Sequence, residues 1–222
     1  MDDPLPLPDP ARSDGFHVRL PEPCEWVPED YFRRARREEV FPDRPEMPLE
    51  VDLGCGDGSF LAALAAARPG INFLGVERLL GRVRKCSRKA VRAGLANVRL
   101  LRLESEYAVE WLLPRESAAR VHLLFPDPWP KRKHHGRRIL RGDFLPCVHQ
   151  LLEPGGELLF KTDHEAYFEW ALEVVAESEG WDHLPWEEDD PCPYPLTDFE
   201  TQWLGQGRTI HRLRLRKRKP AA

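Results

Sequence analysis

Residues 49–60 read LEVDLGCGDGSF, in which an apolar segment runs directly into three closely spaced glycines. The pattern of residues 49–53 predicts a buried strand, and residues 58–68 predict a helix that ends at Pro69 and Gly70. Glycines between a strand and a helix let the backbone approach a bound ligand closely. By itself this spacing fits either a ligand-binding loop or simply a tight turn at this junction.

The same alternation of strand and helix continues on both sides of this stretch. Further strands are expected at 72–76, 98–103, 121–125, 157–161 and 208–216, and helices at 29–40, 79–93, 106–113, 142–152 and 164–179. Strands that alternate with helices in this way indicate an α/β fold with a mostly parallel, doubly wound sheet. We expect a tail over residues 1–27, disordered in part, and a single domain over 28–222.

Length and composition exclude several classes of protein. With 41% hydrophobic and 32% charged residues, the 222-residue chain has an ordinary globular composition. No apolar run is long enough to span a membrane, and the first 15 residues lack the apolar region of a signal peptide. The five cysteines show no metal-binding spacing. A cytoplasmic protein is therefore expected, without a metal site, a disulfide framework or a membrane partner.

Basic residues are concentrated in three short blocks, although the net charge is −4. Residues 82–92, 131–141 and 212–219 each carry six Lys or Arg and no acid, whereas acids cluster elsewhere, as at 187–190. Phosphate binding depends on the local field rather than on the total charge. The blocks are compatible with solvated surfaces, but their number favours a nucleic-acid partner.

Acidic residues follow three successive predicted strands. Asp52 ends the first strand, Glu77 follows the second, and Glu104 follows the third. Ser59 stands where the dinucleotide fingerprint G-x-G-x-x-G requires its third glycine, and Asp52 would repel a pyrophosphate. A carboxylate at Glu77 can accept the ribose hydroxyls of a nucleoside. These acids suit a cationic ligand that contains adenosine better than they suit NAD.

A second group of motifs follows the fourth and fifth predicted strands. Residues 125–138 read FPDPWPKRKHHGRR, in which prolines hold Asp127 and Trp129 in a stiff loop before a run of cations. An acid beside an aromatic ring, backed by cations, suits a base within a phosphate-rich ligand. Asp163 can cap the following helix, or accept the N1 and N2 hydrogens of a guanine, or do both. Residues 197–200 predict only a loop or a short helix.

These motifs together resemble the bacterial tRNA (guanine-N7-)-methyltransferases, which are class I, Rossmann-like methyltransferases. The resemblance covers residues 49–215 and is most specific in FPDPW with its following cations, in ELLFKTDH at 157–164, and in TDFE with GRTIHR at 197–212. It implies an antiparallel C-terminal strand, a cytoplasmic enzyme, no obligate protein partner, and methylation of the guanine at position 46 of the tRNA variable loop. S-adenosylmethionine would be the cofactor and S-adenosylhomocysteine the product.

The resemblance also implies roles for individual residues. Asp127 matches the acid of the family's active site. The cofactor would be bound by Asp52, Gly54, Gly56, Glu77, Glu104 and Asp127, and the tRNA by Lys131, Asp163, Thr197, Asp198, Phe199 and Glu200. Two positions depart from the family's pattern, because the family usually has Glu at Asp52 and often Lys at Gln202.

Three other functions remain open at this point. One is a methyltransferase for another RNA or for a small molecule, which the FPDPW motif and its cations disfavour. Another is a non-catalytic RNA-binding module, although acids stand at every expected cofactor position. The last is an NAD-binding protein, which Ser59 and Asp52 disfavour.

Overall fold

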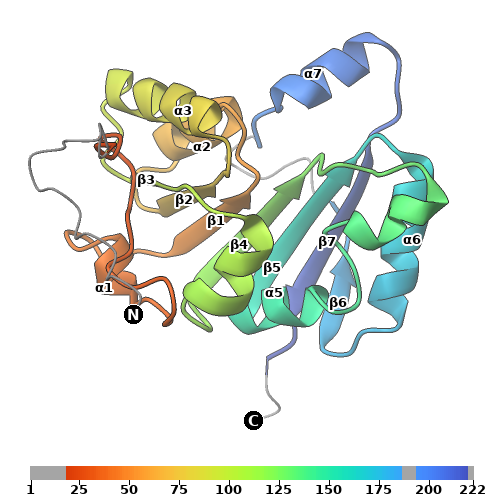
Figure 1. Ribbon diagram of the computed structural model, residues 1–222. Helices are drawn as coiled ribbons and strands as arrows, with labels where there is room; N and C mark the ends of the chain where they lie inside the picture. Colours follow the sequence, from red (N-terminus) through yellow and green to blue (C-terminus); the bar gives the residue numbers. More distant parts are fainter. Residues whose placement is uncertain (1–18, 187–193, 220–222) are drawn as a thin grey trace, which may run out of the picture.

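The computed structural model describes residues 19–186 and 194–219, in which seven strands form one sheet (Figure 1). The strands are β1 (Leu49–Leu53), β2 (Asn72–Val76), β3 (Val98–Leu101), β4 (Ala118–Leu124), β5 (Leu152–Thr162), β6 (Trp181–Leu184) and β7 (His211–Lys217). Their order in the sheet is β3-β2-β1-β4-β5-β7-β6. The first five pair in parallel, whereas β7 is antiparallel to both β5 and β6. This confirms the expected doubly wound sheet with an antiparallel C-terminal strand.

Helices connect the strands and cover both faces of the sheet. They are α1 (Arg37–Val40), α2 (Ser59–Ala67), α3 (Leu80–Arg92), α4 (Ser105–Tyr107) with the π-helical turn η1 (Ala108–Leu112), the 3-10 helix η2 (Arg132–Arg137), α5 (Leu145–Leu151), α6 (Glu165–Ala176) and α7 (Asp198–Gly205). One core cluster packs η1, α5 and α6 on one face, and a second packs α2 and α3 on the other. Every residue of β1 and β2 is buried, as expected for strands covered on both sides.

The order of the strands determines where a ligand can bind. From β1 the chain moves outward to β2 and β3 on one side, and β4 and β5 then extend the sheet on the other side. In open parallel sheets the crevice at such a reversal, outside the carboxyl ends of the strands, is the usual binding site. Figure 1 shows α7 above this edge, apart from the helices that cover the two faces.

The N-terminal part of the domain differs from the sequence prediction. A helix over residues 29–40 is wrong, because only Arg37–Val40 is helical. The backbone N–H of Ala35 donates to Leu112 O at 2.8 Å, and the Arg34 guanidinium donates to the carbonyls of Glu110 and Leu113. This segment therefore satisfies the free carbonyls at the end of η1 instead of forming its own helical turns.

The segment just before residue 28 also packs against the sheet. Cys24 O accepts from Leu100 N, and Trp26 N donates to Leu100 O, both at 2.8 Å, so the chain pairs with the edge strand β3. Cys24 and Trp26 are buried in the two cores. The expected boundary after residue 27 thus falls inside a packed segment, whereas residues 1–18 of the expected tail lie outside the described residues.

At the other end one strand was not expected, and the sequence did not decide between a loop and a short helix at residues 197–200. Strand β6 was missed because it is a short edge strand with two exposed residues, which leaves little apolar pattern. Residues 197–200 begin a full helix, α7, with Thr197 at its N-cap. Within the described parts of the chain, no helix is both long and apolar enough to cross a bilayer.

Candidate active site

The glycine loop between β1 and α2 forms the floor of the candidate site. Gly54, Gly56 and Gly58 all have positive φ angles, a conformation that favours glycine. A Cβ atom at Gly58 would lie 2.1 Å from Cys86 Sγ, so the loop can only pack this closely on α3 without a side chain. A Cβ at Gly54 would contact nothing within 4 Å, because this part of the loop faces an open cleft.

Two acids from neighbouring strands lie beside this loop. Asp52 and Glu77 are 3% and 5% exposed. Glu77 accepts the N–H of Leu79 at 2.8 Å and lies 3.5 Å from Arg82. Burial, reinforced by the negative charge of Glu77, raises the pKa of Asp52 to about 7. Within residues 19–186 and 194–219, no group donates a hydrogen bond to the Asp52 carboxylate. A buried carboxylate without a partner is expected to receive one from a ligand.

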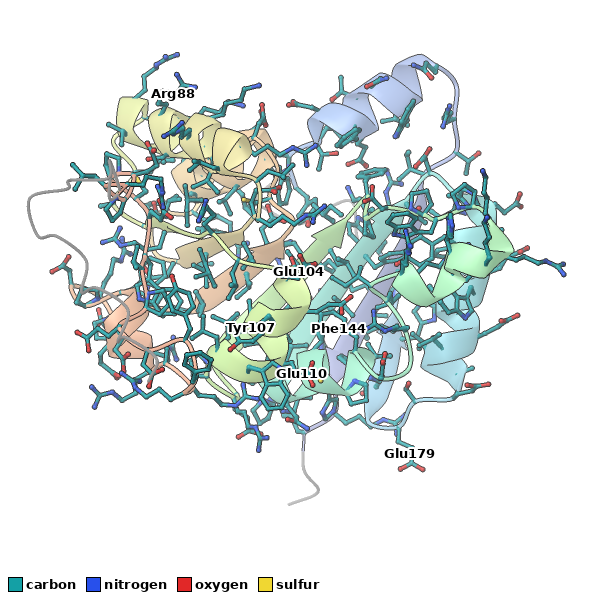
Figure 2. All side chains as sticks on the ribbon, viewed as in Figure 1. Arg88, Glu104, Tyr107, Glu110, Phe144 and Glu179 are labelled. Atoms are coloured by element: carbon teal, nitrogen blue, oxygen red, sulfur yellow. The ribbon has the colours of Figure 1, made fainter. Side chains whose placement is uncertain are left out.

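The cleft consists of two adjoining cavities that share Gly54 and Asp127. One, of about 290 Å³, is lined by Asp52, Gly56 and the first residues of α7. The other, of about 420 Å³, is lined by Glu77, Glu104, Trp129 and Arg137, among others. Figure 2 shows Glu104 at the start of α4, near the strand ends. All six residues expected to bind a cofactor therefore line one continuous cleft.

The loop after β4 places Asp127 and Trp129 at the mouth of the cleft. Phe125 and Trp129 have φ angles of 51° and 43°, a region that costs non-glycine residues on the order of 1–3 kcal/mol. Asp127 is exposed, and the Arg137 guanidinium lies 5.1 Å from the centre of the Trp129 ring. Lys131 is also exposed and directly precedes η2. The loop thus presents an acid, an indole and cations to solvent beside the cleft.

Arg138, unlike Arg137, does not belong to this exposed group. It is 1% exposed, its Nε donates to Pro128 O at 2.9 Å, and its guanidinium lies 4.6 Å from the centre of the Trp170 ring. The run of cations that contains both arginines was expected to face a phosphate-rich ligand, and this expectation needs correction for Arg138. Arg138 holds the proline-rich loop against α6, and Arg137 remains available to a ligand.

Some residues expected to bind the substrate are accessible to solvent, and others are buried. The exposed Phe199 lines the cleft, whereas Asp163 follows β5 and is not among the residues that line it. Asp198 accepts a hydrogen bond from Ser59 Oγ at 2.9 Å. Thr197 caps α7 by accepting the N–H of Glu200 at 2.9 Å. Glu200 is fully buried, so its carboxylate acts within the protein.

A buried ion pair joins α7 to β5. Lys161 Nζ lies 2.8 and 2.7 Å from the two Glu200 oxygens and close to the rings of Trp186 and Tyr194. Burial lowers the pKa of Lys161, and the Glu200 carboxylate opposes this effect. The sequence interpretation did not identify this pair, although a lysine in the apolar run ELLFKT requires a buried partner. The T-x-x-E spacing of residues 197–200 also matches a helix N-terminus.

Comparison with solved structures defines the class of protein. The 16S rRNA methyltransferase KamB superposes with a TM-score of 0.59 at 20% identity, covering 82% of this chain and 93% of that chain. The antibiotic-resistance methyltransferase Kmr gives 0.58 at 22%, covering 83% and 94%. The fold is therefore that of a class I methyltransferase.

Sequence comparison identifies the family within this class. Residues 46–213 match a family described as putative methyltransferase. The tRNA (guanine-N(7)-)-methyltransferase of Halorhodospira halophila is 37% identical over 178 residues, covering 79% of this chain and 77% of the relative. The enzyme of the same name from Lactococcus lactis subsp. cremoris (strain MG1363) is 31% identical over 206 residues, covering 90% of each. The chain belongs to the tRNA (guanine-N(7)-)-methyltransferase family, which confirms the resemblance drawn from its motifs.

Proposed function

We propose that this protein transfers a methyl group from S-adenosylmethionine to N7 of the guanine at position 46 of tRNA. The observation that carries the proposal is the buried Asp52 carboxylate, which lies beside Glu77 and accepts no hydrogen bond from residues 19–186 or 194–219, in a cleft bordered by the PDPW loop. The relatives' shared name supports tRNA as the substrate. Such an enzyme would act in the cytoplasm, where its substrate is found.

The residues present fit S-adenosylmethionine. Asp52 offers a negative charge to an ammonium group, Glu77 offers acceptors to ribose hydroxyls, and the open face of Gly54 allows close approach. Gly56 and Glu104 complete the lining of the cleft. When bound, this cofactor supplies a methyl group on a positively charged sulfur.

The chemistry of guanine N7 explains what the protein must provide. N7 carries a free lone pair and no proton, so the reaction requires no general base. Catalysis then depends on orientation and on electrostatic stabilisation. The methylated ring becomes positively charged, and the exposed Asp127 carboxylate at the mouth of the cleft would offset that charge. Because the N7 edge lies in the deep major groove of A-form RNA, the target base must be unstacked or in a loop.

The test is transfer of a labelled methyl group to bulk tRNA from a strain that lacks N7-methylguanine, followed by nucleoside analysis. We expect label in N7-methylguanosine only, and none in a tRNA transcript with adenosine at position 46. Isolated small ribosomal subunits provide the comparison for the alternative of another RNA substrate. Label in the ribosomal RNA but not in tRNA would contradict the proposal.

A further inference from the structure

Three residues meet at the carboxyl end of β5. Asp163 follows β5, Trp203 lies in α7, and Arg208 lies in the turn after α7. Arg208 Nη1 donates to Asp163 Oδ2 at 2.7 Å, and the Arg208 guanidinium carbon lies 4.0 Å from the centre of the Trp203 ring. The backbone N–H of Arg208 also donates to Trp203 O at 2.9 Å, which returns the chain over the indole.

Asp163 and Trp203 hold the guanidinium of Arg208, which is a flat group with adjacent N–H donors. The Asp163 carboxylate accepts one N–H at the edge of the guanidinium, while the Trp203 indole lies against its face. The Watson–Crick edge of guanine has the same character, because N1–H and the N2 amino group are neighbouring donors in one plane. Aromatic side chains stack on unstacked bases in the same way. The groups that bind the Arg208 guanidinium therefore suit a guanine.

A row of aromatic side chains connects this place to the cleft. The Trp203 and Phe199 rings are stacked with their centres 6.5 Å apart, and Phe199 lies 6.4 Å from Phe125. Phe125 and Phe199 line the same cavity as Asp127. N7 of guanine lies on the five-membered ring, away from N1 and N2. A guanine bound at Asp163 by its Watson–Crick edge can therefore present N7 towards the cleft.

The family resemblance already implies that Asp163 binds the tRNA. We propose that Trp203 completes this site as the surface on which the target guanine stacks, and that Arg208 occupies the site until tRNA displaces it. The side chains of Asp163 and Arg208 are 19% and 47% exposed, so the pair is open to exchange with a ligand. The inference rests on the proposed function and adds Trp203 and Arg208 to Asp163, which the resemblance already implies. Arg208 is thus an internal competitor of the substrate rather than a contact to it.

The first experiment compares Arg208→Ala and Arg208→Lys in steady-state methylation of tRNA. A competitor lowers the apparent affinity for the substrate by the fraction of sites that it occupies. An exposed ion pair with a cation–π contact corresponds to roughly a three- to tenfold effect. Both variants should therefore raise kcat/KM by about that factor, through a lower KM for tRNA, since lysine lacks the planar donor fork. If instead Ala lowers kcat/KM and Lys restores it, Arg208 binds the tRNA directly and the inference is wrong.

The second experiment tests Asp163 and Trp203 with a tRNA transcript that carries inosine at the target position. Inosine keeps N7 and N1–H but lacks the N2 amino group. The wild type should prefer guanosine by at least about tenfold in kcat/KM, as expected for one hydrogen bond to a charged group. Asp163→Ala should lose this preference, and Trp203→Leu should lower kcat/KM for both transcripts while Trp203→Phe restores it.

The outcomes separate this inference from the proposed function. Methylation of the guanosine transcript by the wild type tests the function before any variant is made. S-adenosylmethionine affinity and Tm, measured for each variant, identify effects that arise from folding. An unchanged guanosine preference in Asp163→Ala, in an enzyme that methylates tRNA at N7, would overturn the guanine site alone.

Discussion

At the scale of single residues, Asp52 connects stability to ligand binding. Its carboxyl group lies at the end of β1, where burial and the charge of Glu77 raise its pKa from 3.8 to about 7. The folded state thus binds the proton more tightly than the unfolded state does. Stability is therefore lost as the pH rises from about 4 to 7, and the full loss persists above pH 7. A cationic ligand would reverse this penalty by favouring the ionised carboxylate.

Replacing Asp52 by Asn should separate the effect of the buried carboxyl group on stability from its effect on ligand binding. At pH 8 the variant should be more stable than the wild type by a few kcal/mol, and the difference should shrink towards zero near pH 4. Its affinity for S-adenosylmethionine should fall by about 1.5–3 kcal/mol, because a charged hydrogen bond is lost. Urea denaturation at pH 5 and pH 8 and calorimetry measure these quantities. Glu104→Gln, an exposed acid in the same cleft, is the control for stability. A pH-independent stability difference would contradict the role of burial.

Adjacent arginines provide a second prediction at this scale. Arg137→Glu should keep the Tm of the wild type, weaken tRNA binding and reduce the slope of log Kd against log salt concentration by about 1. Arg138→Glu should instead destabilise the fold by on the order of 4 kcal/mol, because a carboxylate would replace a buried guanidinium between Tyr167 and Trp170. Thermal unfolding and filter binding of both variants check the contrast. Equal Tm values would show that Arg138 is not structurally required.

At the scale of elements, α7 is held over the strand ends by its first turn. Asp198 accepts a hydrogen bond from Ser59 at the start of α2, and Glu200 pairs with Lys161 of β5. Both contacts come from residues within one helical turn. The position of Phe199 in the cleft, and of Trp203 beside Asp163, therefore depends on these two attachments.

Breaking the buried ion pair should detach this helix. Glu200→Leu leaves the Lys161 ammonium buried without its carboxylate, which should cost about 3–5 kcal/mol, whereas Lys161→Met with Glu200→Leu should recover most of that loss. Urea denaturation of the single and double variants gives the coupling energy. Glu173→Gln on the exposed side of α6 should change stability by less than about 0.5 kcal/mol. If the free energies of unfolding lost in Glu200→Leu and in Lys161→Met add up to the loss in the double variant, the two charges act independently.

At the scale of the whole molecule, the charges are unevenly distributed around a net value of −4. Exposed cations on α3 (Arg82, Arg84, Lys85, Arg88 and Arg92) and in η2 flank the cleft on two sides. Figure 2 shows Arg88 on the outer side of α3, pointing away from the sheet. Such surfaces suit a polyanion larger than the cleft itself.

Salt should therefore affect the binding of tRNA and the binding of S-adenosylmethionine differently. Binding of tRNA should weaken steeply as salt rises from 50 to 200 mM, as counterion release requires, while S-adenosylmethionine binding changes little.

At saturating cofactor the methylation rate should not rise tenfold per pH unit between pH 6 and 8, because N7 needs no deprotonation. Stopped assays across this pH range provide the measurement. A rise of that size, abolished in Asp127→Ala or Asp163→Ala, would indicate proton abstraction and a different target atom.

The sequence predicted most of the parallel sheet, and the six residues expected to bind a cofactor line one cleft. Asp52, Glu77 and Glu104 lie at or just after the ends of β1, β2 and β3, and the carboxyl ends of parallel strands meet at one edge, so local patterns sufficed. The prediction was wrong where a segment bonds to a distant element, as Arg34 and Ala35 do with η1. It also gave the same role to Arg137 and Arg138, because burial is not visible in a run of cations.

By itself the sequence determined the order of the elements, the glycine loop and the acids at the strand ends, because periodicity and turn chemistry are local properties of the chain. Only the tertiary structure decided which charges are buried pairs. Lys161 and Glu200 are 39 residues apart, and the Arg208–Asp163 pair spans 45. The sequence does not indicate which residue pairs with a given charged residue. The partner is distant along the chain and comes close only through the packing of α7 on β5. The same packing determines which side chains remain accessible to bind a nucleotide base.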